Sequence, residues 1–507
     1  MSDENVPPQA VEPRHKLRML LRNPVSLAGI ALGIVSLANI FLFVLMDQIA
    51  AKPSPYIGIL AYMVSPGFLI FSFVLVLAGL LLERRKKVAP TAFYPRIDLN
   101  DPKQRGAVIS FLSFLMVFVL VSAAGSYKAY EFTDSVQFCG QLCHTVMSPE
   151  FTAYQLSSHA RVACVECHVG AGATWYVKSK LSGARQVYAT IFNVYPRPIP
   201  TPVQNLRPAQ QTCEQCHWPK KFYGAQLKVF THYASDEQNT VRQIRLLIKT
   251  GGGDPATGAP AGIHWHMNIA NKIDYVAADE QRQVIPYIHV EDVQGRVTEY
   301  YAKDSKMTRD QIAKAQRRRM DCVDCHNRPT HVYVSPDQAV DQSLLARRLD
   351  VSLPFIKQQA VTVLTGNYAT TAAAMEGIAN GLHDFYESKY PDVARTKQLE
   401  IRNAVDEVQQ IFRRTTFPEM KVNWMTHPNN LGHFYFIGCF RCHDGQHVST
   451  DGKVLSKDCN LCHTVLSQEE GSTSLTSVPV AAFKHPVDIG DLSQVTCSDC
   501  HTGGTGP

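Results

Sequence analysis

The chain has 507 residues, of which 45% are hydrophobic and 19% are charged, so it can hold more than one domain and is not intrinsically disordered. Its formal net charge of +6 is small for this length, which argues against a nucleic-acid-binding surface. Its 14 cysteines are the most informative count, because nearly all of them recur in one short pattern.

Three apolar runs open the chain, at 24–46, 56–82 and 106–124, and each is long enough for a membrane span of about 20 residues. Basic residues flank the first run and follow the second, whereas the link between these two runs carries one basic residue, Lys52. The positive-inside rule therefore places the N-terminus and the second link in the cytoplasm, and everything after about Tyr127 outside it. The first run lacks a small-residue cleavage site, so it predicts an anchor rather than a removed signal peptide.

The first cysteine pair follows in the stretch VQFCGQLCHTVM, where Cys139 and Cys143 are separated by three residues and His144 comes next. The usual haem-attachment signal is C-x-x-C-H, in which both thiols bond the porphyrin and the histidine binds its iron. A haem site with a longer loop is one reading, and Gly140 could ease that loop by taking a positive φ. A local disulfide in an oxidising compartment is the other reading.

Six unstretched C-x-x-C-H motifs follow, and with the first pair they use every cysteine of the chain. Zinc sites do not need a histidine after every cysteine pair, and a thioredoxin-like centre needs only one pair. The motifs therefore predict six haem c groups and favour a seventh at the first pair. The predicted attachment cysteines are Cys139, Cys143, Cys164, Cys167, Cys213, Cys216, Cys322, Cys325, Cys439, Cys442, Cys459, Cys462, Cys497 and Cys500. The predicted proximal iron ligands are His144, His168, His217, His326, His443, His463 and His501.

Two stretches between the motifs contain none of them. The first includes an alternating segment from Gln283 and another from Arg296 to Tyr301, joined by the turn-like Asp292–Gly295, which predicts a β-hairpin. The second, 335–425, has leucines at 344, 345, 349 and 353 and branched residues at 401, 405, 408 and 411, which is helical spacing. The predicted segments are a cytoplasmic 1–23, a three-helix membrane region 24–126, a three-haem segment 127–221, a mixed segment 222–334 with the fourth haem, a helical insertion 335–425 and a three-haem segment 426–507.

The fold class expected is a membrane-anchored multihaem cytochrome c, with three N-terminal transmembrane helices and a loop-rich, mainly α haem domain that contains a small β-hairpin region. The sixth iron ligands must then come from histidines outside the motifs. Two histidines lie in Ile263-His-Trp-His-Met267, and we expect one of them, His266, to bind iron. Met147, three residues after His144, either supplies a thioether ligand or packs on a porphyrin. The remaining predicted ligands are His159, His232, His331, His427, His433, His447 and His485.

The stretch from Cys139 to His217, with its core HARVACVECH, resembles the NapC/NirT family of membrane-anchored quinol dehydrogenase cytochromes. Three spans and seven motifs depart from the single span and four haems usual there, and are similar instead to the inner-membrane heptahaem cytochromes of metal-reducing bacteria. The resemblance implies quinol oxidation near a membrane-proximal haem, with a methionine ligand at the position of Met147. It also implies a lysine in the quinol pocket after the second motif, where Lys178, Lys180 and Arg185 lie; binding of lipid headgroups is the alternative role for these residues.

The expected function is therefore oxidation of (mena)quinol at the bacterial inner membrane, with electrons passed through seven haems in the periplasm to periplasmic cytochromes or a reductase. The lipid bilayer is the other expected partner, and nucleic acid is not one. A passive conduit within a larger complex, without its own quinol site, stays open. A haem-based terminal reductase is the third reading, but it needs an open iron position, and all seven motifs end in histidine.

Overall fold

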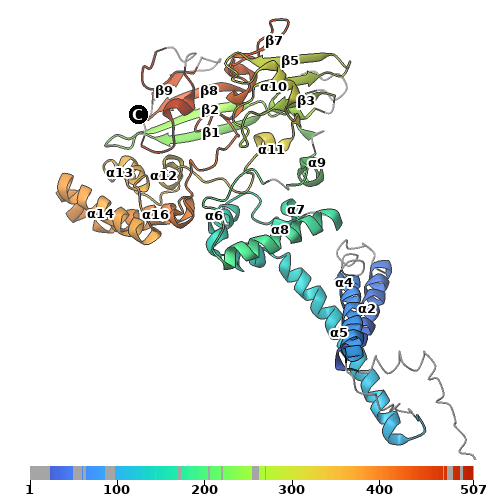
Figure 1. The fold of residues 1–507 in the computed structure, drawn as a ribbon. Helices are drawn as coiled ribbons and strands as arrows, with labels where there is room; N and C mark the ends of the chain where they lie inside the picture. Colours follow the sequence, from blue (N-terminus) through green and yellow to red (C-terminus); the bar gives the residue numbers. More distant parts are fainter. Residues whose placement is uncertain are drawn as a thin grey trace, which may run out of the picture. The chain divides into compact units, whose positions relative to one another are not determined.

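A computed structural model describes residues 23–49, 60, 64–85, 98–142, 144–169, 173–203, 206–218, 221–253, 262–268, 270–471, 473–476, 483–490 and 495–505 (Figure 1). The chain forms two compact units. The first comprises Met1–Phe138 and Ala171–Val177, and the second comprises Cys139–Gly170 and Lys178–Pro507.

The first unit contains three helices long and apolar enough to cross a membrane, which confirms the predicted anchor. They are α2 (Pro24–Ile49), α4 (Ser65–Arg85) and α5 (Pro102–Thr133). The third helix is longer than its apolar run predicts, because the polar residues up to Thr133 continue the same helix. Part of the second predicted span, 56–59 and 61–63, lies outside the described residues.

Helices α2 and α4 pack closely through small residues. A methyl group on Gly29 of α2 would lie 2.8 Å from the backbone oxygen of Ser72, and one on Gly33 would lie 3.0 Å from the hydroxyl of the same serine. Asn23 donates to the carbonyl oxygen of Gly79 at 2.8 Å. In a membrane, small residues one turn apart let two helix backbones approach, and buried polar side chains then find partners across the interface.

The second unit carries all the cysteine motifs. Its helical segments before residue 336 are η2 (Phe138–Leu142), which begins one residue earlier, α6 (His144–Gln155), α7 (Cys164–His168), most of α8 (Ala173–Ile191), α9 (Ala209–Thr212), η3 (Cys213–Gln215), η5 (Ile263–Met267), α10 (Arg309–Lys314) and α11 (Cys322–Cys325). Those after it are α12 (Pro336–Leu345), α13 (Ile356–Leu364), α14 (Thr371–Lys389), α15 (Pro391–Thr396), α16 (Gln398–Thr415), η6 (Pro418–Met420), η7 (Gly438–Arg441), η8 (Cys459–Leu461) and α17 (Cys497–Cys500).

Two antiparallel sheets of the second unit hold the nine strands of the described residues. The first sheet has the order β1 (Gln226–Tyr233), β2 (Val241–Ile248), β8 (His463–Glu470) and β9 (Thr473–Thr476). The second has the order β6 (Arg318–Arg319), β3 (Lys272–Val276), β4 (Tyr287–Glu291), β5 (Val297–Ala302) and β7 (His447–Ser449). Strands β4 and β5 pair antiparallel across Gly295, which has a φ of 75°, so the predicted hairpin is confirmed.

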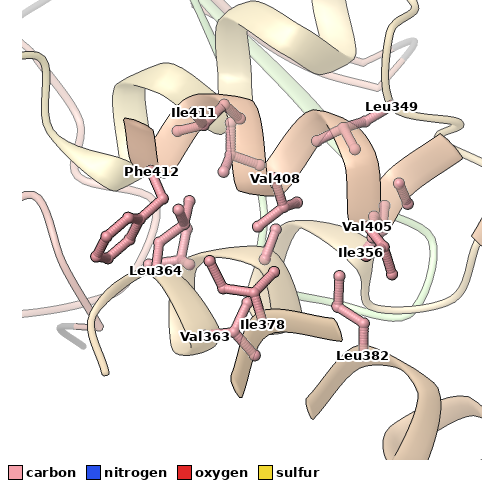
Figure 2. Close-up of a cluster of buried hydrophobic side chains, with 14 of the residues drawn as sticks. Leu349, Ile356, Val363, Leu364, Ile378, Leu382, Val405, Val408, Ile411 and Phe412 are labelled. Atoms are coloured by element: carbon pink, nitrogen blue, oxygen red, sulfur yellow. The ribbon is translucent and has the colours of Figure 1, made fainter. Parts of the chain in front are cut away.

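The helices α12 to α16 form the main hydrophobic core (Figure 2). Most of the apolar positions that predicted these helices are buried there: Leu344 on α12, and Ile401, Val405, Val408 and Ile411 on α16. The predicted repeat 344–353 is not one helix, because α12 ends at Leu345, which is 58% exposed, and Leu349 and Leu353 are buried in the turns before α13. Each such fully buried side chain contributes about 1.5–3 kcal/mol relative to exposure. Ser335 caps α12 by accepting from the backbone N–H of Gln338, and Pro336 begins the helix, as its missing N–H allows.

Candidate haem centres

The unstretched motifs fold locally into single helical turns. In four of them the backbone N–H of the motif histidine donates to the carbonyl oxygen of the first cysteine: His217 to Cys213 at 2.8 Å, His326 to Cys322 at 2.8 Å, His443 to Cys439 at 3.1 Å and His501 to Cys497 at 2.8 Å. Positions i, i+3 and i+4 of a helical turn share one face. Each turn therefore presents two thiols and one imidazole in the same direction, as covalent attachment of a haem requires.

The stretched first motif lies in a π-helical turn, Phe138–Leu142, which takes up one residue more per turn than an α-helix. Gly140 does not use a positive φ there, contrary to the sequence-based expectation. Its hydrogen side chain is needed for space, because an added methyl group would collide with the ring of Phe151. Cys143 and the side chain of His144 lie outside the described residues, so the seventh haem stays a prediction.

Cysteines of motifs that follow one another in the chain are also neighbours in space. The sulfur of Cys164 accepts a hydrogen bond from the thiol of Cys139, and this hydrogen bond lowers the pKa of Cys164 to about 7. Cys213 accepts a hydrogen bond from the Cys322 thiol in the same way, and this lowers the pKa of Cys213 to about 6. These thiols stand where thioether sulfurs would be once haem is attached. Their contacts thus join the first motif to the second and the third to the fourth.

In the later motifs, cysteines of successive motifs lie close enough for the charge of one thiol to raise the pKa of the other. Burial raises the pKa of Cys442 to about 12, and the nearby Cys325 thiol adds to the rise. Burial likewise raises the pKa of Cys462 to about 11, with a further contribution from Cys439. Burial raises the pKa of Cys497, and Cys459 adds to that rise. Burial raises the pKa of Cys167, and the nearby Cys213 adds to that rise, so the second motif also lies near the third and successive motifs are neighbours in space.

Six motif histidines each face a second imidazole. The ring-centre distances and interplanar angles are 6.0 Å and 72° for His217 with His159, 6.2 Å and 47° for His168 with His331, and 6.3 Å and 3° for His326 with His264. They are 5.9 Å and 83° for His443 with His266, 6.1 Å and 21° for His463 with His433, and 6.0 Å and 45° for His501 with His485.

This spacing fits an iron between two imidazoles. An imidazole nitrogen lies about 2 Å from a bound metal ion and the ring centre about 1 Å further, so two imidazoles on opposite sides of one iron have centres about 6 Å apart. Directly packed or hydrogen-bonded rings have no reason to share one separation in six places. The residues present therefore fit haem c with two histidine ligands.

Hydrogen bonds orient several of these rings for metal binding. Nδ1 lies 2.6 Å from the Thr250 carbonyl oxygen in His264, 2.7 Å from that of Ile263 in His266, 3.1 Å from that of Glu150 in His331, 3.0 Å from that of Ser456 in His443 and 2.8 Å from that of Val487 in His485. A proton on Nδ1 that bonds to a carbonyl leaves the lone pair on Nε2. Burial lowers the pKa of His331 to about 4, and His168 adds to this effect, so the ring is neutral at physiological pH.

The two histidines of the 263–267 segment face the histidines of two different motifs. In the 3₁₀ turn η5, His264 faces His326 and His266 faces His443. The sequence predicted one ligand in this segment, His266, so His264 was missed. In a turn with three residues per repeat, positions i and i+2 point in different directions. Seven motifs need several sixth ligands, and two histidines lie close together in this segment; these two features of the sequence could have indicated that both bind iron.

Three other predicted ligands do not face a motif histidine among the described side chains. His447 is buried, with Nδ1 2.9 Å from Asp444 and Nε2 2.7 Å from the carbonyl oxygen of Ile285. Both of its nitrogens therefore donate, which leaves no lone pair and argues against iron binding. His232 lies 3.0 Å from the Asp341 carboxylate and stacks on Phe434.

His427 differs from these two. Its Nδ1 lies 3.1 Å from the Thr201 hydroxyl, and its Nε2 is buried without a hydrogen-bond partner among the described residues. Its ring lies 6.3 Å from that of Tyr333, whose hydroxyl donates to Glu150 of α6. Helix α6 begins at His144. Burying a nitrogen without a hydrogen-bond partner costs free energy, so the Nε2 of His427 is a candidate to bind a metal ion.

Asp337, Asp341 and His232 bring three possible metal-ligand atoms within 4.8 Å of one another. Lys357 already fills the place of a cation there: its Nζ lies 2.6 Å from a carboxylate oxygen of each aspartate. Although burial opposes it, Lys357 holds the pKa of Asp337 below its usual range. The cluster is therefore a buried ion pair that joins α12 to α13.

Hydrogen bonds also fix the fourth motif against the fifth. Arg441, inside the fifth motif, donates to the carbonyl oxygen of Asp324 at 2.7 Å, and Asn430 donates to the same oxygen at 3.0 Å. The Asp324 carboxylate accepts from Tyr275 at 2.8 Å and from Arg318 at 2.8 Å. The spacing of two motifs is thus set by protein contacts as well as by any cofactor.

The residues of the predicted quinol pocket lie on α8. Lys178 and Arg185 are exposed, and the side chain of Lys180 lies outside the described residues. Met147 lies half-buried in α6, one turn after His144.

Comparisons with known proteins identify the family of the chain. The N-terminal region of the NapC/NirT cytochrome c family matches residues 101–198. The cytochrome c-type protein ImcH of Geobacter sulfurreducens is 47% identical over 499 residues, which is 96% of this chain and 98% of that protein. The cytochrome c-type protein NrfH of Wolinella succinogenes is 29% identical over 114 residues, 22% of this chain and 63% of that protein. No solved structure matches the chain.

Proposed function

Because the chain belongs to the NapC/NirT family of membrane cytochromes c, we propose that it oxidises (mena)quinol and passes the electrons through seven haem c groups to periplasmic acceptors. The single observation that carries the proposal is the set of six histidine pairs spaced for iron, in a chain that also has three apolar helices of membrane-spanning length. By the positive-inside rule the haem motifs face the periplasm of a bacterial inner membrane.

Quinol oxidation releases two electrons and two protons, and each haem iron can take up one of the electrons as it goes from the ferric to the ferrous state. The cysteines of each motif hold one porphyrin, and the motif histidine binds its iron from one side. The sixth ligands in the proposal are His331, His159, His264, His266, His433 and His485, for the second to the seventh motif in that order. With two imidazoles on each of these irons, no open position is left for a substrate, which speaks against a terminal reductase.

The first motif takes its sixth ligand from His427 in this proposal. The Nε2 of His427 is buried and has no hydrogen-bond partner among the described residues, and the ring lies beside Tyr333, which bonds to Glu150; both observations support this choice. Met147 is the alternative that the family resemblance offers. His447 is not a ligand in the proposal, because both of its nitrogens have acceptors. His232 is not one either, because its ring stacks on Phe434 and faces no motif histidine among the described side chains.

The order of the motifs supports a chain of haems that electrons traverse from the first motif to the last. Cysteines of successive motifs lie near one another, from Cys139 and Cys164 at the start to Cys459 and Cys497 at the end, so neighbours in sequence are also neighbours in space. Quinol is oxidised next to the first motif, where Lys178, Lys180 and Arg185 of α8 form the proposed pocket. Cationic side chains there would stabilise the anionic quinol that forms as the first proton leaves.

The test is anaerobic addition of a menaquinol analogue to the purified protein while the reduced-haem absorption bands are followed. Prompt partial reduction is expected, and it should slow strongly in a Lys178→Met, Lys180→Met double variant. Lys389→Met, on the exposed surface of α14, is the matched control. No reduction in a protein that dithionite reduces fully would leave the chain as a conduit fed by another subunit.

A further inference from the structure

Helix α8 has no buried face in its described part. From Lys178 to Ile191 no described side chain is buried. The helix ends firmly, since Asn193 takes a φ of 53° and the Val194 N–H donates to the Ala189 carbonyl oxygen at 2.9 Å. An isolated helix of this length is marginal in water, and protein helices gain their stability by burying an apolar face. The helix therefore requires a partner.

Its apolar side chains gather on one face, which we call the α8 stripe. Spacings of three, four and seven residues place them together. The stripe consists of Leu181, Val187, Tyr188, Ile191 and Phe192, with exposed fractions of 69%, 45%, 59%, 71% and 60%. The rings of Tyr188 and Phe192 are 4.6 Å apart, so the stripe has a continuous aromatic end.

The charge of the helix has one sign. Its 19 residues contain no aspartate or glutamate, and its charged residues are Lys178, Lys180 and Arg185. Lys178 and Arg185 are exposed and lie one helical repeat of seven residues apart, along one edge of the stripe. An apolar face with aromatic residues and a basic edge is the pattern of helices that lie in a membrane interface.

We propose that the α8 stripe lies in the headgroup region of an anionic bilayer, parallel to the membrane surface. The same chain carries three apolar helices of membrane-spanning length, so a bilayer is available to this helix. Burial of the stripe supplies the hydrophobic contribution, and the exposed Lys178 and Arg185 at its edge are attracted to anionic groups at the membrane surface, by about 1 kcal/mol each. The helix then fixes the orientation of the haem-bearing unit on the membrane.

The test uses thiol labelling of the full chain in nanodiscs that contain anionic phospholipid. Ile191→Cys lies on the stripe, and Gln186→Cys is its matched control, exposed and off the stripe. Native cysteines are bound to haem in the proposed function, and labelling of the unchanged protein measures any remainder. A membrane-impermeant maleimide should react about 10-fold more slowly at Ile191→Cys than at Gln186→Cys, because the first thiol lies among acyl chains.

A phospholipid with a diazirine near its headgroup identifies what covers the stripe. Photolysis should attach lipid to the segment that contains residues 186–194. Equal maleimide rates at the two positions would show that the stripe faces water, and the proposal would then be wrong. Slow labelling at Ile191→Cys without lipid attachment would mean that haem, another part of the chain or a second copy covers the stripe, which also overturns the proposal. Quinol oxidation does not enter either readout, so both results leave the proposed function as it stands.

Discussion

The rings of His264 and His326 lie 3° from parallel with their centres 6.3 Å apart, while those of His266 and His443 cross at 83°. In low-spin ferric haem the angle between the two ligand planes controls the splitting of the iron d orbitals. Parallel planes give a rhombic electron paramagnetic resonance signal, and perpendicular planes give a strongly anisotropic one. We expect the oxidised protein to show both signals. A spectrum with rhombic signals alone would contradict the perpendicular pair.

Replacing His264 should leave one haem iron without its sixth ligand. In His264→Ala the haem of the fourth motif loses its sixth ligand, so part of the low-spin signal becomes high-spin and the reduced protein binds carbon monoxide. The measurement is carbon monoxide difference absorption, per haem. His383→Ala is the control, because His383 is exposed on α14 and faces none of the motif histidines whose side chains are described. Unchanged spectra in His264→Ala would exclude it as a ligand.

The first motif can be tested by its own pair of variants. His427→Ala should convert one haem to a high-spin state, whereas Met147→Leu should leave all haems low-spin. The reason is the buried Nε2 of His427, which has no protein partner among the described residues. The reverse result, with loss of a far-red charge-transfer band in Met147→Leu, would assign the thioether instead. Intact-protein mass measures whether seven haems are attached in each variant.

Removing the buried ammonium of Lys357 should destabilise the helical core. Lys357→Met leaves Asp337 and Asp341 close together and without their cation, and loss of one partner of a buried ion pair costs about 3–5 kcal/mol. Urea unfolding followed by far-ultraviolet circular dichroism measures this loss. Lys389→Met, on the surface of α14, should change the midpoint little. A similar midpoint for both variants would argue against the buried pair.

The contribution of His447 should depend on pH. Burial alone would lower its pKa, but the hydrogen bonds to Asp444 and to the Ile285 carbonyl oxygen raise it above the usual value for histidine. A group whose pKa is raised by folding stabilises the protein fully below its unfolded pKa, and this effect is lost as pH rises through the folded pKa. His447→Gln should therefore cost about 1.5–3 kcal/mol at pH 6 and less at pH 9, in unfolding free energies at both values. A cost that grows with pH would show that His447 is neutral in the folded protein.

Much of the architecture could be predicted because its signals are local. The apolar runs, the C-x-x-C-H turns, the hairpin around Gly295 and the helical periodicity of 335–425 each depend on residues close in sequence. The partnership of the histidines is not local. His159 precedes the second motif by five residues but faces His217 of the third, and His331 follows the fourth motif but faces His168 of the second.

The first sheet also escaped prediction. Its strands β2 and β8 pair although they are far apart in sequence, and β8 begins at a motif histidine, His463. Neither strand shows a clean alternation of buried and exposed residues, because most of their side chains are half-buried. A pattern of period two appears only where one face is covered and the other is open to water.

The distant origin of the ligand pairs means that each iron would act as a cross-link in the chain. An iron held by His168 and His331, or by His264 and His326, closes a long loop much as a disulfide does, and it removes conformational freedom from the unfolded chain. Outside the helical core, the described residues of the second unit form small apolar clusters. The loops that carry the motifs would then be held partly by metal bonds, so attachment of the cofactors and folding of these loops would be coupled.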